Sequence, residues 1–280
     1  MAIHAPEFYE REYSGGRARI PDYDSYFTRW AEDSAVVRAE LAAHLDLEYG
    51  PGPKETLDLF PSGQKDAPLL IFIHGGYWRS MDKRDFDWIA RSFVRAGINV
   101  AVPNYAPCPA VTIADITESC RRALVWLYHH AVDYEVSARR LIVTGHSAGG
   151  HLTGMMFATD WNTYGMPSDT IGGGVSLSGL FDLEPLRYTS MNADWRLDET
   201  SARASSPAFF QPRVKAKMVT AVGALESSEF LRQSQIIAAA WPDVSHPALH
   251  VKDCHHFNIL DAFTDLKGEI WQAAAGMLYG

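Results

Sequence analysis

The sequence predicts an α/β fold in which helices cover both faces of a mainly parallel central sheet. Short apolar runs such as Leu69-Leu-Ile-Phe-Ile73 are continuous rather than alternating, which is typical of strands buried on both faces. Segments of helical periodicity separate these runs, and strands that alternate with helices imply right-handed crossovers and parallel pairing. The chain has 280 residues and 47% apolar content, so we expect a single domain over residues 1–280.

Residues 1–50 are expected to form an N-terminal arm followed by a helix. Residues 1–20 are polar and irregular, and apolar side chains then recur at helical spacing from Asp22 to Leu47. The first half of this helix carries an aromatic stripe, formed by Tyr23, Tyr26, Phe27 and Trp30. We expect the stripe to pack on the body of the protein. The alternative is that its aromatic end roofs a substrate pocket.

The elements after residue 50 follow from the apolar runs and the turn residues between them. Residues 56–60 alternate as an outer strand should, after the turn at Gly50-Pro-Gly-Pro53. The further expected strands span residues 69–73, 98–102, 141–143, 174–177, 218–222 and 248–251. The expected helices span residues 82–96, 113–132, 148–158 and 229–240, with a last helix reaching Leu278. Residues 180–212 are less regular, and we expect a small cap-like insertion there.

The run Gly145-His146-Ser147-Ala148-Gly149 follows a predicted strand and matches the G-x-S-x-G pattern of a nucleophile elbow. The serine of such a turn has a strained backbone, so the residues two before and two after it must be glycines. Its hydroxyl would stand at the N-terminus of a helix, where backbone N–H groups favour negative charge. We expect Ser147 to be a nucleophile. The alternative is a glycine-rich turn that only lets strand and helix pack closely.

Acyl transfer by serine also needs a base and an orienting carboxylate, on loops that follow later strands in the order acid, then histidine. Glu226 lies in the loop after the last but one predicted strand, while Glu229 is placed to begin a helix. Adjacent His255 and His256 follow the last strand, and periodicity cannot separate them. We assign the acid to Glu226, with Asp253 as its rival. The carboxylate and spacing of a zinc motif are missing here, so we expect no metal.

The oxyanion donors should be backbone N–H groups. One is that of Ala148, which follows the nucleophile. Gly76 and Tyr77 would supply the others from the loop after residues 69–73, where Gly75-Gly76 lets the backbone approach the substrate. His74 is expected to brace this loop.

Charge and cysteine content limit the partners and the compartment. The net charge is −9 and no Lys/Arg cluster occurs, which argues against nucleic acid and anionic membranes as partners. The N-terminus is acidic where a signal peptide needs an apolar core, and no stretch is long enough to span a bilayer. Cys108, Cys120 and Cys254 are odd in number and far apart, so we expect a cytoplasmic protein without disulfides. Cys254 lies two positions before His256, which suggests a nucleophilic cysteine as an alternative, but Cys254 lies at the wrong end of the fold for that role.

These motifs together resemble one family. The runs in question are His74-Gly-Gly-Tyr-Trp78, Gly145-His-Ser-Ala-Gly-Gly150, Ser178-Gly-Leu-Phe-Asp-Leu-Glu-Pro185, the stretch 222–233 and His256-Phe-Asn-Ile259. The assembly is similar to arylformamidases (kynurenine formamidases) of the α/β-hydrolase superfamily. The resemblance implies hydrolysis of N-formylkynurenine-like aryl formamides without a metal or other cofactor. It also favours His256 over His255, because the family histidine directly precedes a phenylalanine. Aspartate is common in the family at the positions of Glu226 and Asn258.

We therefore expect a serine hydrolase that cleaves small acyl groups through an acyl-enzyme, with His256 as base and Glu226 steadying the imidazolium. Its substrate is expected to be a small aromatic molecule. The pocket residues are expected to be Tyr77, Trp78, His146, Phe181 and Trp195. One alternative is a general carboxylesterase acting on short-chain or aryl esters, and another is a ligand-binding protein without turnover. A homodimer is left open.

Overall fold

The computed structural model describes residues 4–15, 19–167, 169–274 and 276–277. The strands are β1 (His44–Glu48), β2 (Thr56–Phe60), β3 (Leu69–Ile73), β4 (Asn99–Pro103), β5 (Leu141–His146), β6 (Ile171–Leu177), β7 (Met218–Gly223) and β8 (Leu249–Val251). The longer helices are α2 (Tyr23–Glu40), α4 (Ile113–His130), α5 (Ala148–Ala158) and α8 (Ser228–Ala240). The shorter ones are α1 (Pro6–Tyr9), α3 (Ala90–Arg95), α6 (Asn192–Trp195), α7 (Glu199–Ala204), α9 (Ile259–Thr264) and α10 (Glu269–Ala273). Among the described residues, no helix combines the length and apolar character that crossing a membrane requires.

The strands form one sheet in the order β1-β2-β4-β3-β5-β6-β7-β8. β2 pairs antiparallel with both β1 and β4, and every later neighbour pair is parallel. The predicted mainly parallel sheet is therefore confirmed. Because the carboxyl ends of the parallel strands share one edge, the loops after β3, β5, β7 and β8 converge there.

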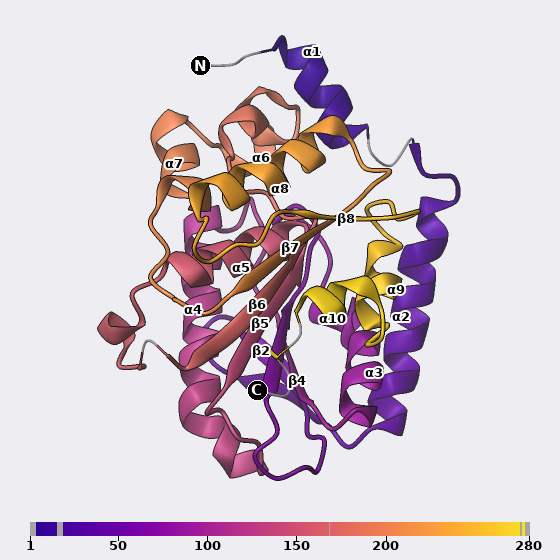
Figure 1. The fold of residues 1–280 in the computed structure, drawn as a ribbon, viewed down its shortest axis with the longest axis vertical. Helices are drawn as coiled ribbons and strands as arrows, with labels where there is room; N and C mark the ends of the chain where they lie inside the picture. Colours follow the sequence, from indigo (N-terminus) through magenta and orange to yellow (C-terminus); the bar gives the residue numbers. More distant parts are fainter. Residues whose placement is uncertain (1–3, 16–18, 168, 275, 278–280) are drawn as a thin grey trace.

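Helices cover both faces of the sheet, with α4, α5 and α8 on one side and α2, α3, α9 and α10 on the other (Figure 1). The position of β3 between the two helix layers explains why its sequence is continuously apolar. Leu69, Ile71 and Ile73 belong to the core beneath α4 and α5. Leu70 and Phe72 belong to the core beneath α2, α3 and α9. Each side chain of this strand is therefore buried, whichever face it points to.

The N-terminal half of the chain departs from the prediction in one important place. The helix expected over residues 22–47 ends at Glu40, and residues 44–48 form β1, which pairs with β2. Leu41 has an extended backbone, with φ −92° and ψ 147°. The expected strand at residues 56–60 exists, but it is not the outer one. The apolar spacing of residues 41–47 suits a helix or an edge strand, and pairing with β2 decides between them.

Other boundaries differ by less. Residues 83–89 form two short 3₁₀ turns before α3, although one helix was expected over 82–96. The last expected helix is split into α9 and α10 by an extended Asp265, and its predicted end at Leu278 lies outside the described residues. The arm also contains structure, namely α1 and a π-helical turn at Glu10–Ser14, called η1.

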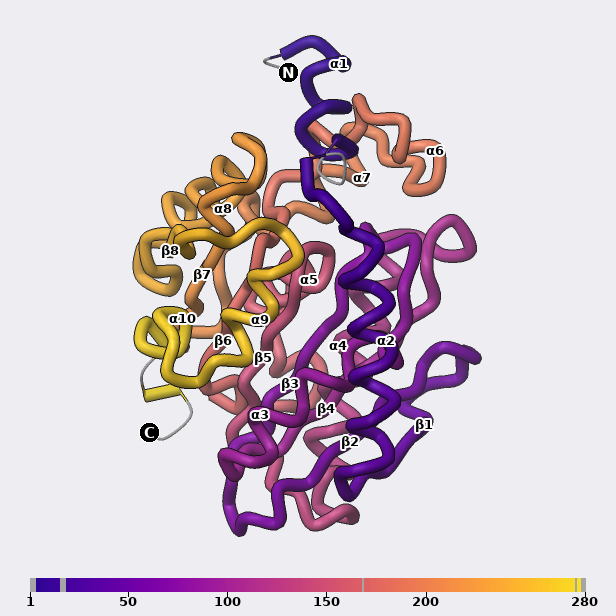
Figure 2. Tube along the Cα trace, turned by 90° about the vertical axis from the view of Figure 1, so that its right-hand side faces the viewer, coloured from indigo at the N-terminus to yellow at the C-terminus, as the bar shows by residue number. Residues whose placement is uncertain are grey.

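The predicted cap segment, residues 180–212, consists of α6, α7 and short 3₁₀ turns at Glu184–Tyr188 and Pro207–Phe209. It lies at the same end of the molecule as α1 (Figure 2). Tyr9 of α1 stacks on Tyr188 of the cap, with ring centroids 5.9 Å apart. The arm and the cap segment therefore meet, although 179 positions of sequence separate those two rings.

Candidate active site

Ser147 stands in a tight turn between β5 and α5. Its backbone has φ 57° and ψ −115°, a conformation that a non-glycine residue rarely adopts. The flanking glycines are a steric necessity. A Cβ on Gly145 would lie 2.3 Å from the Gly149 carbonyl oxygen, and one on Gly149 would lie 1.9 Å from that of Ile73. The turn therefore has the geometry of a nucleophile elbow.

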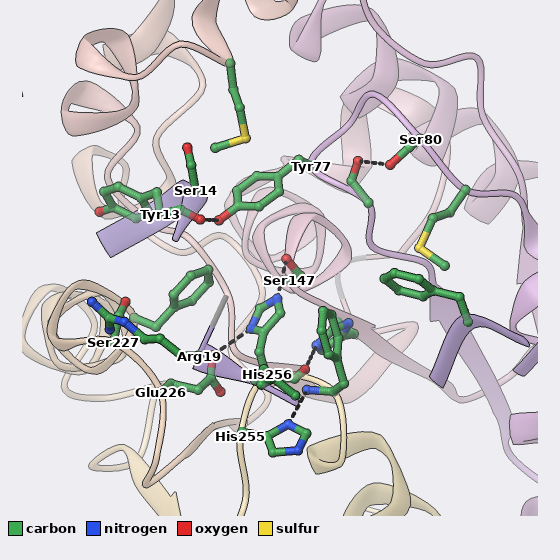
Figure 3. A pocket seen from close by; sticks show the side chains of 18 of the residues that line it. Tyr13, Ser14, Arg19, Tyr77, Ser80, Ser147, Glu226, Ser227, His255 and His256 are labelled. Atoms are coloured by element: carbon green, nitrogen blue, oxygen red, sulfur yellow. Dashed lines mark hydrogen bonds and ion pairs between the residues drawn. The ribbon is translucent and has the colours of Figure 1, made fainter. Parts of the chain in front are cut away.

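Ser147, His256 and Glu226 form a hydrogen-bonded triad (Figure 3). The Ser147 Oγ lies 3.1 Å from His256 Nε2. On the other side of the ring, His256 Nδ1 lies 2.6 Å from Glu226 Oε2. The three residues come from the loops after β5, β8 and β7, so the shared edge of the sheet brings them together. This is the arrangement that lets an imidazole take a proton from a serine hydroxyl.

Glu226 divides its two carboxylate oxygens between the loop and the imidazole. Oε1 accepts hydrogen bonds from the Gly223 N–H (2.8 Å) and from the Ser178 hydroxyl (2.6 Å), while Oε2 faces His256. The side chain is 1% exposed. The side chain of Glu226 thus turns back on its own loop, which takes up the methylene by which glutamate exceeds aspartate.

The rivals of these residues point elsewhere. Asp253 is 84% exposed and lies beside Lys252. Glu229 binds the Tyr13 hydroxyl and Arg232, and His255 Nε2 lies 3.2 Å from the Tyr26 hydroxyl of α2. Burial raises the pKa of the Cys254 thiol to about 11, so this cysteine is not a thiolate near neutral pH.

His146 supports the backbone of the loop that carries His256. Its Nε2 lies 2.7 Å from the carbonyl oxygen of His256, to which it donates. Burial, followed by the neighbouring His256, holds the pKa of His146 well below its usual range. A neutral imidazole at this position holds the loop that carries His256 without adding positive charge beside it.

The loop after β3 approaches Ser147 closely. A Cβ on Gly75 would lie 3.3 Å from the Ser147 Cβ, and Gly76 has a φ of 105°. Each of three peptide carbonyls nearby is bound: Gly75 O by His74 Nδ1 (2.8 Å), Gly76 O by Arg79 N (3.0 Å) and Ser147 O by His151 N (3.0 Å). In a planar trans peptide, the N–H points away from the carbonyl. The bound carbonyls therefore fix the directions of the Gly76, Tyr77 and Ala148 N–H groups.

A cavity of about 570 Å³ opens beside Ser147 and His256. Most of its lining is apolar or aromatic, and the N-terminal arm, α2, the loop after β3, the cap segment and the loops after β7 and β8 all contribute to it. Its larger apolar residues are Tyr13, Ile20, Phe27, Trp30, Tyr77, Met81, Phe86, Met191, Leu225, Phe230 and Phe257. Besides Glu226 and the histidines, its charged residues are Glu12, Arg19 and Arg79. The cavity therefore presents a mostly apolar wall with a few charged side chains to a small molecule bound beside Ser147.

The structure places the pocket residues expected from sequence in two different layers. Tyr77 and His146 line the cavity, but Trp78, Phe181 and Trp195 do not belong to its described lining. These three are 0%, 0% and 3% exposed, and they pack behind the wall. The Trp195 indole, for example, donates to the Tyr77 carbonyl. Bulky aromatic residues next to a predicted site are as well suited to its support as to its surface, and sequence does not separate the two.

The sequence did not predict that the N-terminal arm lines the cavity, because a polar segment at a chain end gives no periodic signal. A signal for α2 did exist in its aromatic stripe. Tyr26 packs on Phe257, whereas Phe27 and Trp30 reach the cavity wall. Both interpretations of the stripe, packing on the body and roofing a pocket, therefore describe part of it.

Within the described part of the chain, no group of three or more His, Cys, Asp or Glu side chains is arranged to hold a metal ion.

Comparison with known proteins identifies the family. The BD-FAE family model matches residues 57–196. Kynurenine formamidases from Danio rerio and Salmo salar are 30% and 29% identical over 79% and 86% of this chain, and the matches cover 77% and 84% of theirs. The crystal structure of a candidate thioesterase from Silicibacter sp. TM1040 superposes with a TM-score of 0.81 at 34% identity, over 93% of this chain and 96% of that one. The protein is a hydrolase of the α/β-hydrolase fold and belongs to the kynurenine formamidase family.

Proposed function

We propose that the protein is an arylformamidase that hydrolyses N-formyl derivatives of aromatic amines, with N-formylkynurenine as the representative substrate. The observation that carries the proposal is the hydrogen-bonded triad of Ser147, His256 and Glu226 beside a cavity lined mostly by apolar and aromatic side chains. The relatives named kynurenine formamidases, which match over most of the chain, support the choice of a formamide.

In the proposed first step, His256 Nε2 takes the proton of the Ser147 hydroxyl as Oγ attacks the formyl carbon. The carbonyl oxygen becomes an oxyanion, which accepts hydrogen bonds from the N–H groups of Gly76, Tyr77 and Ala148. Each such donor contributes about 2.7–4 kcal/mol of transition-state stabilisation in related oxyanion holes. Glu226 orients the imidazolium that forms.

In the second step, the imidazolium gives its proton to the nitrogen of the leaving arylamine as the C–N bond breaks. The formyl group then remains on Ser147 Oγ. Water, deprotonated by His256, attacks this ester, formate leaves and the serine regains its proton. Protonation of the leaving nitrogen is essential for an amide, because an unprotonated amine is a poor leaving group.

A carboxylesterase is the second candidate, and the candidate thioesterase at 34% identity favours it. The same residues would cleave an activated ester without needing to protonate an amine. Esterase activity alone therefore does not identify the substrate.

A side-by-side comparison of kcat/KM for N-formylkynurenine and a short p-nitrophenyl ester tests the proposal. Among aryl substrates with different acyl groups, we expect the rate to fall from formyl to acetyl to butyryl, because the loop after β3 crowds the serine. One methylene is worth only about 1–3 kcal/mol in an apolar pocket, so the preference for formyl has to come from steric exclusion near the elbow. A faster butyryl substrate would favour the general esterase.

The aromatic nature of the substrate, a cytoplasmic location and a homodimer belong to the same proposal. The mostly apolar cavity wall supports the first. The buried thiols of Cys108, Cys120 and Cys254 are free and suit a reducing compartment. Cell fractionation tests the location, and light scattering on the purified protein tests the homodimer.

A further inference from the structure

The loop proposed to bind the oxyanion has an unfavourable backbone. Tyr77 and Trp78 have φ angles of 52° and 56°, so two consecutive non-glycine residues are left-handed. Each such residue costs about 1–2 kcal/mol relative to the right-handed conformation. Strain of this kind persists only where the surrounding structure holds it in place.

The short helix α6 of the cap segment supplies one of the contacts that hold this strain. The indole Nε1 of Trp195 donates to the Tyr77 carbonyl oxygen at 2.7 Å. The neighbouring Asp194 forms an ion pair with Arg79, with 3.0 Å between Oδ2 and Nε. The Trp195 ring also lies 5.7 Å from the rings of both Tyr77 and Trp78, measured between centroids. α6 is therefore attached to the loop within its strained pair and directly after it.

The rest of the loop is held by other elements. The Tyr77 hydroxyl donates to the Tyr13 carbonyl of the arm, and the Cys108 N–H donates to the Trp78 carbonyl. These bonds hold the Tyr77 side chain and the carbonyl that ends the strained pair, whereas the Trp195 bond holds the carbonyl between its two residues. Loss of the Trp195 bond would leave the Tyr77 carbonyl without this donor and allow the Tyr77–Trp78 peptide to rotate.

We propose that Trp195 is a positioning residue that keeps the Tyr77 N–H directed at the oxyanion. It does so indirectly. Its hydrogen bond fixes the Tyr77–Trp78 peptide and with it the left-handed Tyr77 backbone, while the Gly76 carbonyl, bound by Arg79 N, belongs to the peptide that carries the Tyr77 N–H. The inference rests on the proposed function, since it assigns Tyr77 to the oxyanion hole. Trp195 then acts on catalysis from behind the cavity wall, without touching the substrate.

Trp195→Phe tests this, because it removes the indole N–H and keeps an aromatic ring. Trp241→Phe is the matched control. Trp241 is also buried, and its Nε1 donates to the Phe210 carbonyl at the same distance of 2.7 Å, away from the site. We expect Trp195→Phe to lower kcat at least about 10-fold with KM changed less than about 2-fold, since a small misplacement of an active-site group costs up to about 10²-fold. Trp241→Phe should leave kcat unchanged.

A rescue variant separates positioning from general destabilisation. Trp195→His retains a ring N–H and should recover part of the turnover that Trp195→Phe loses. If Trp195→Phe does not fold, Asp194→Asn loosens the other attachment of α6, and a lower kcat at unchanged KM is again expected. Equal kcat values for Trp195→Phe and Trp241→Phe, or for Asp194→Asn and the wild type in that second case, would overturn the inference.

Both substrate classes should be used, so that the two proposals fail in different ways. A wild-type enzyme that cleaves p-nitrophenyl acetate but not N-formylkynurenine contradicts the proposed substrate, and the Trp195 comparison is then made on the ester. A wild type that cleaves both substrates, together with an unaffected Trp195→Phe, contradicts only the positioning role.

Discussion

Glu226 shows how a single methylene is accommodated in the active site. Oε1 is bound by the Gly223 N–H and the Ser178 hydroxyl, and this leaves Oε2 for His256. An aspartate at this position would have to give up one side of this arrangement, because its carboxylate lies closer to the main chain.

The first prediction follows from that geometry. Glu226→Asp should lower kcat/KM by about 10- to 100-fold, because the carboxylate no longer reaches the imidazole at bonding distance. Glu226→Gln should lower it further, by up to about 10⁴-fold, because an amide does not stabilise the imidazolium. Steady-state kinetics on the formamide and the ester measure both effects.

Asp253→Asn is the control for these variants. Its side chain is 84% exposed, so we expect kcat/KM within about 2-fold of the wild type. A large loss in Asp253→Asn, with little loss in Glu226→Gln, would exchange the roles of the two carboxylates.

At the scale of elements, the contact between the elbow and β3 leaves no room for a methyl group. Gly149→Ala would place its Cβ 1.9 Å from the Ile73 carbonyl oxygen, so strand and helix must move apart. We expect the free energy of unfolding to fall by about 3 kcal/mol, as for severe overpacking. Gly52→Ala, whose Cβ would meet the Glu55 side chain at 3.2 Å rather than backbone, should lower it much less. Urea denaturation of both variants checks this, and equal stabilities would contradict the packing argument.

α5 also carries a buried histidine that makes stability depend on pH. His151 accepts a hydrogen bond from the Trp78 indole and donates one to the Ser205 carbonyl, and burial lowers its pKa from 6.5 to about 4. Between these values, the unfolded chain binds a proton that the folded protein does not. The contribution of His151 to stability is therefore complete above pH 6.5 and is lost as the pH falls towards 4.

His151→Gln should remove this dependence, since a neutral amide can replace both hydrogen bonds. Across that window, the wild type should lose about 3 kcal/mol of unfolding free energy more than the variant does. Denaturant titrations at pH 4.5, 5.5 and 7 measure the difference. Parallel pH profiles for the two proteins would mean that His151 titrates normally in the folded state.

At the scale of the whole molecule, the N-terminal arm closes one side of the cavity through two carboxylates. Glu10 accepts hydrogen bonds from the N–H and hydroxyl of Ser190 in the cap segment, and Glu12 does the same with Ser228 at the start of α8. Replacing both glutamates with alanine should loosen the arm and raise KM for aryl substrates several-fold, with kcat within about 2-fold. Glu7→Ala, at an exposed position of the same arm, is the control. An unchanged KM would show that the arm does not contribute to binding.

The parts that sequence predicted and the parts that it missed differ in their physical origin. β3, β5 and the elbow were predictable because buried runs and obligatory glycines are local signals. β1 was not, because an edge strand depends on pairing with a partner elsewhere in the chain. Motif order and strand ends predicted Ser147, Glu226 and one of the two adjacent histidines, and the family resemblance favoured His256 over His255. The support of Tyr77 by Trp195 spans 118 positions and has no local pattern.

The most direct test of the proposed mechanism is labelling with a fluorophosphonate, which reacts selectively with an activated serine hydroxyl. We expect the wild type to be modified on Ser147, identified by peptide mass spectrometry, and to lose all hydrolytic activity in parallel. Ser147→Ala should remain unlabelled. Absence of labelling in the wild type, or labelling that persists in Ser147→Ala, would contradict the assignment of Ser147 as the nucleophile.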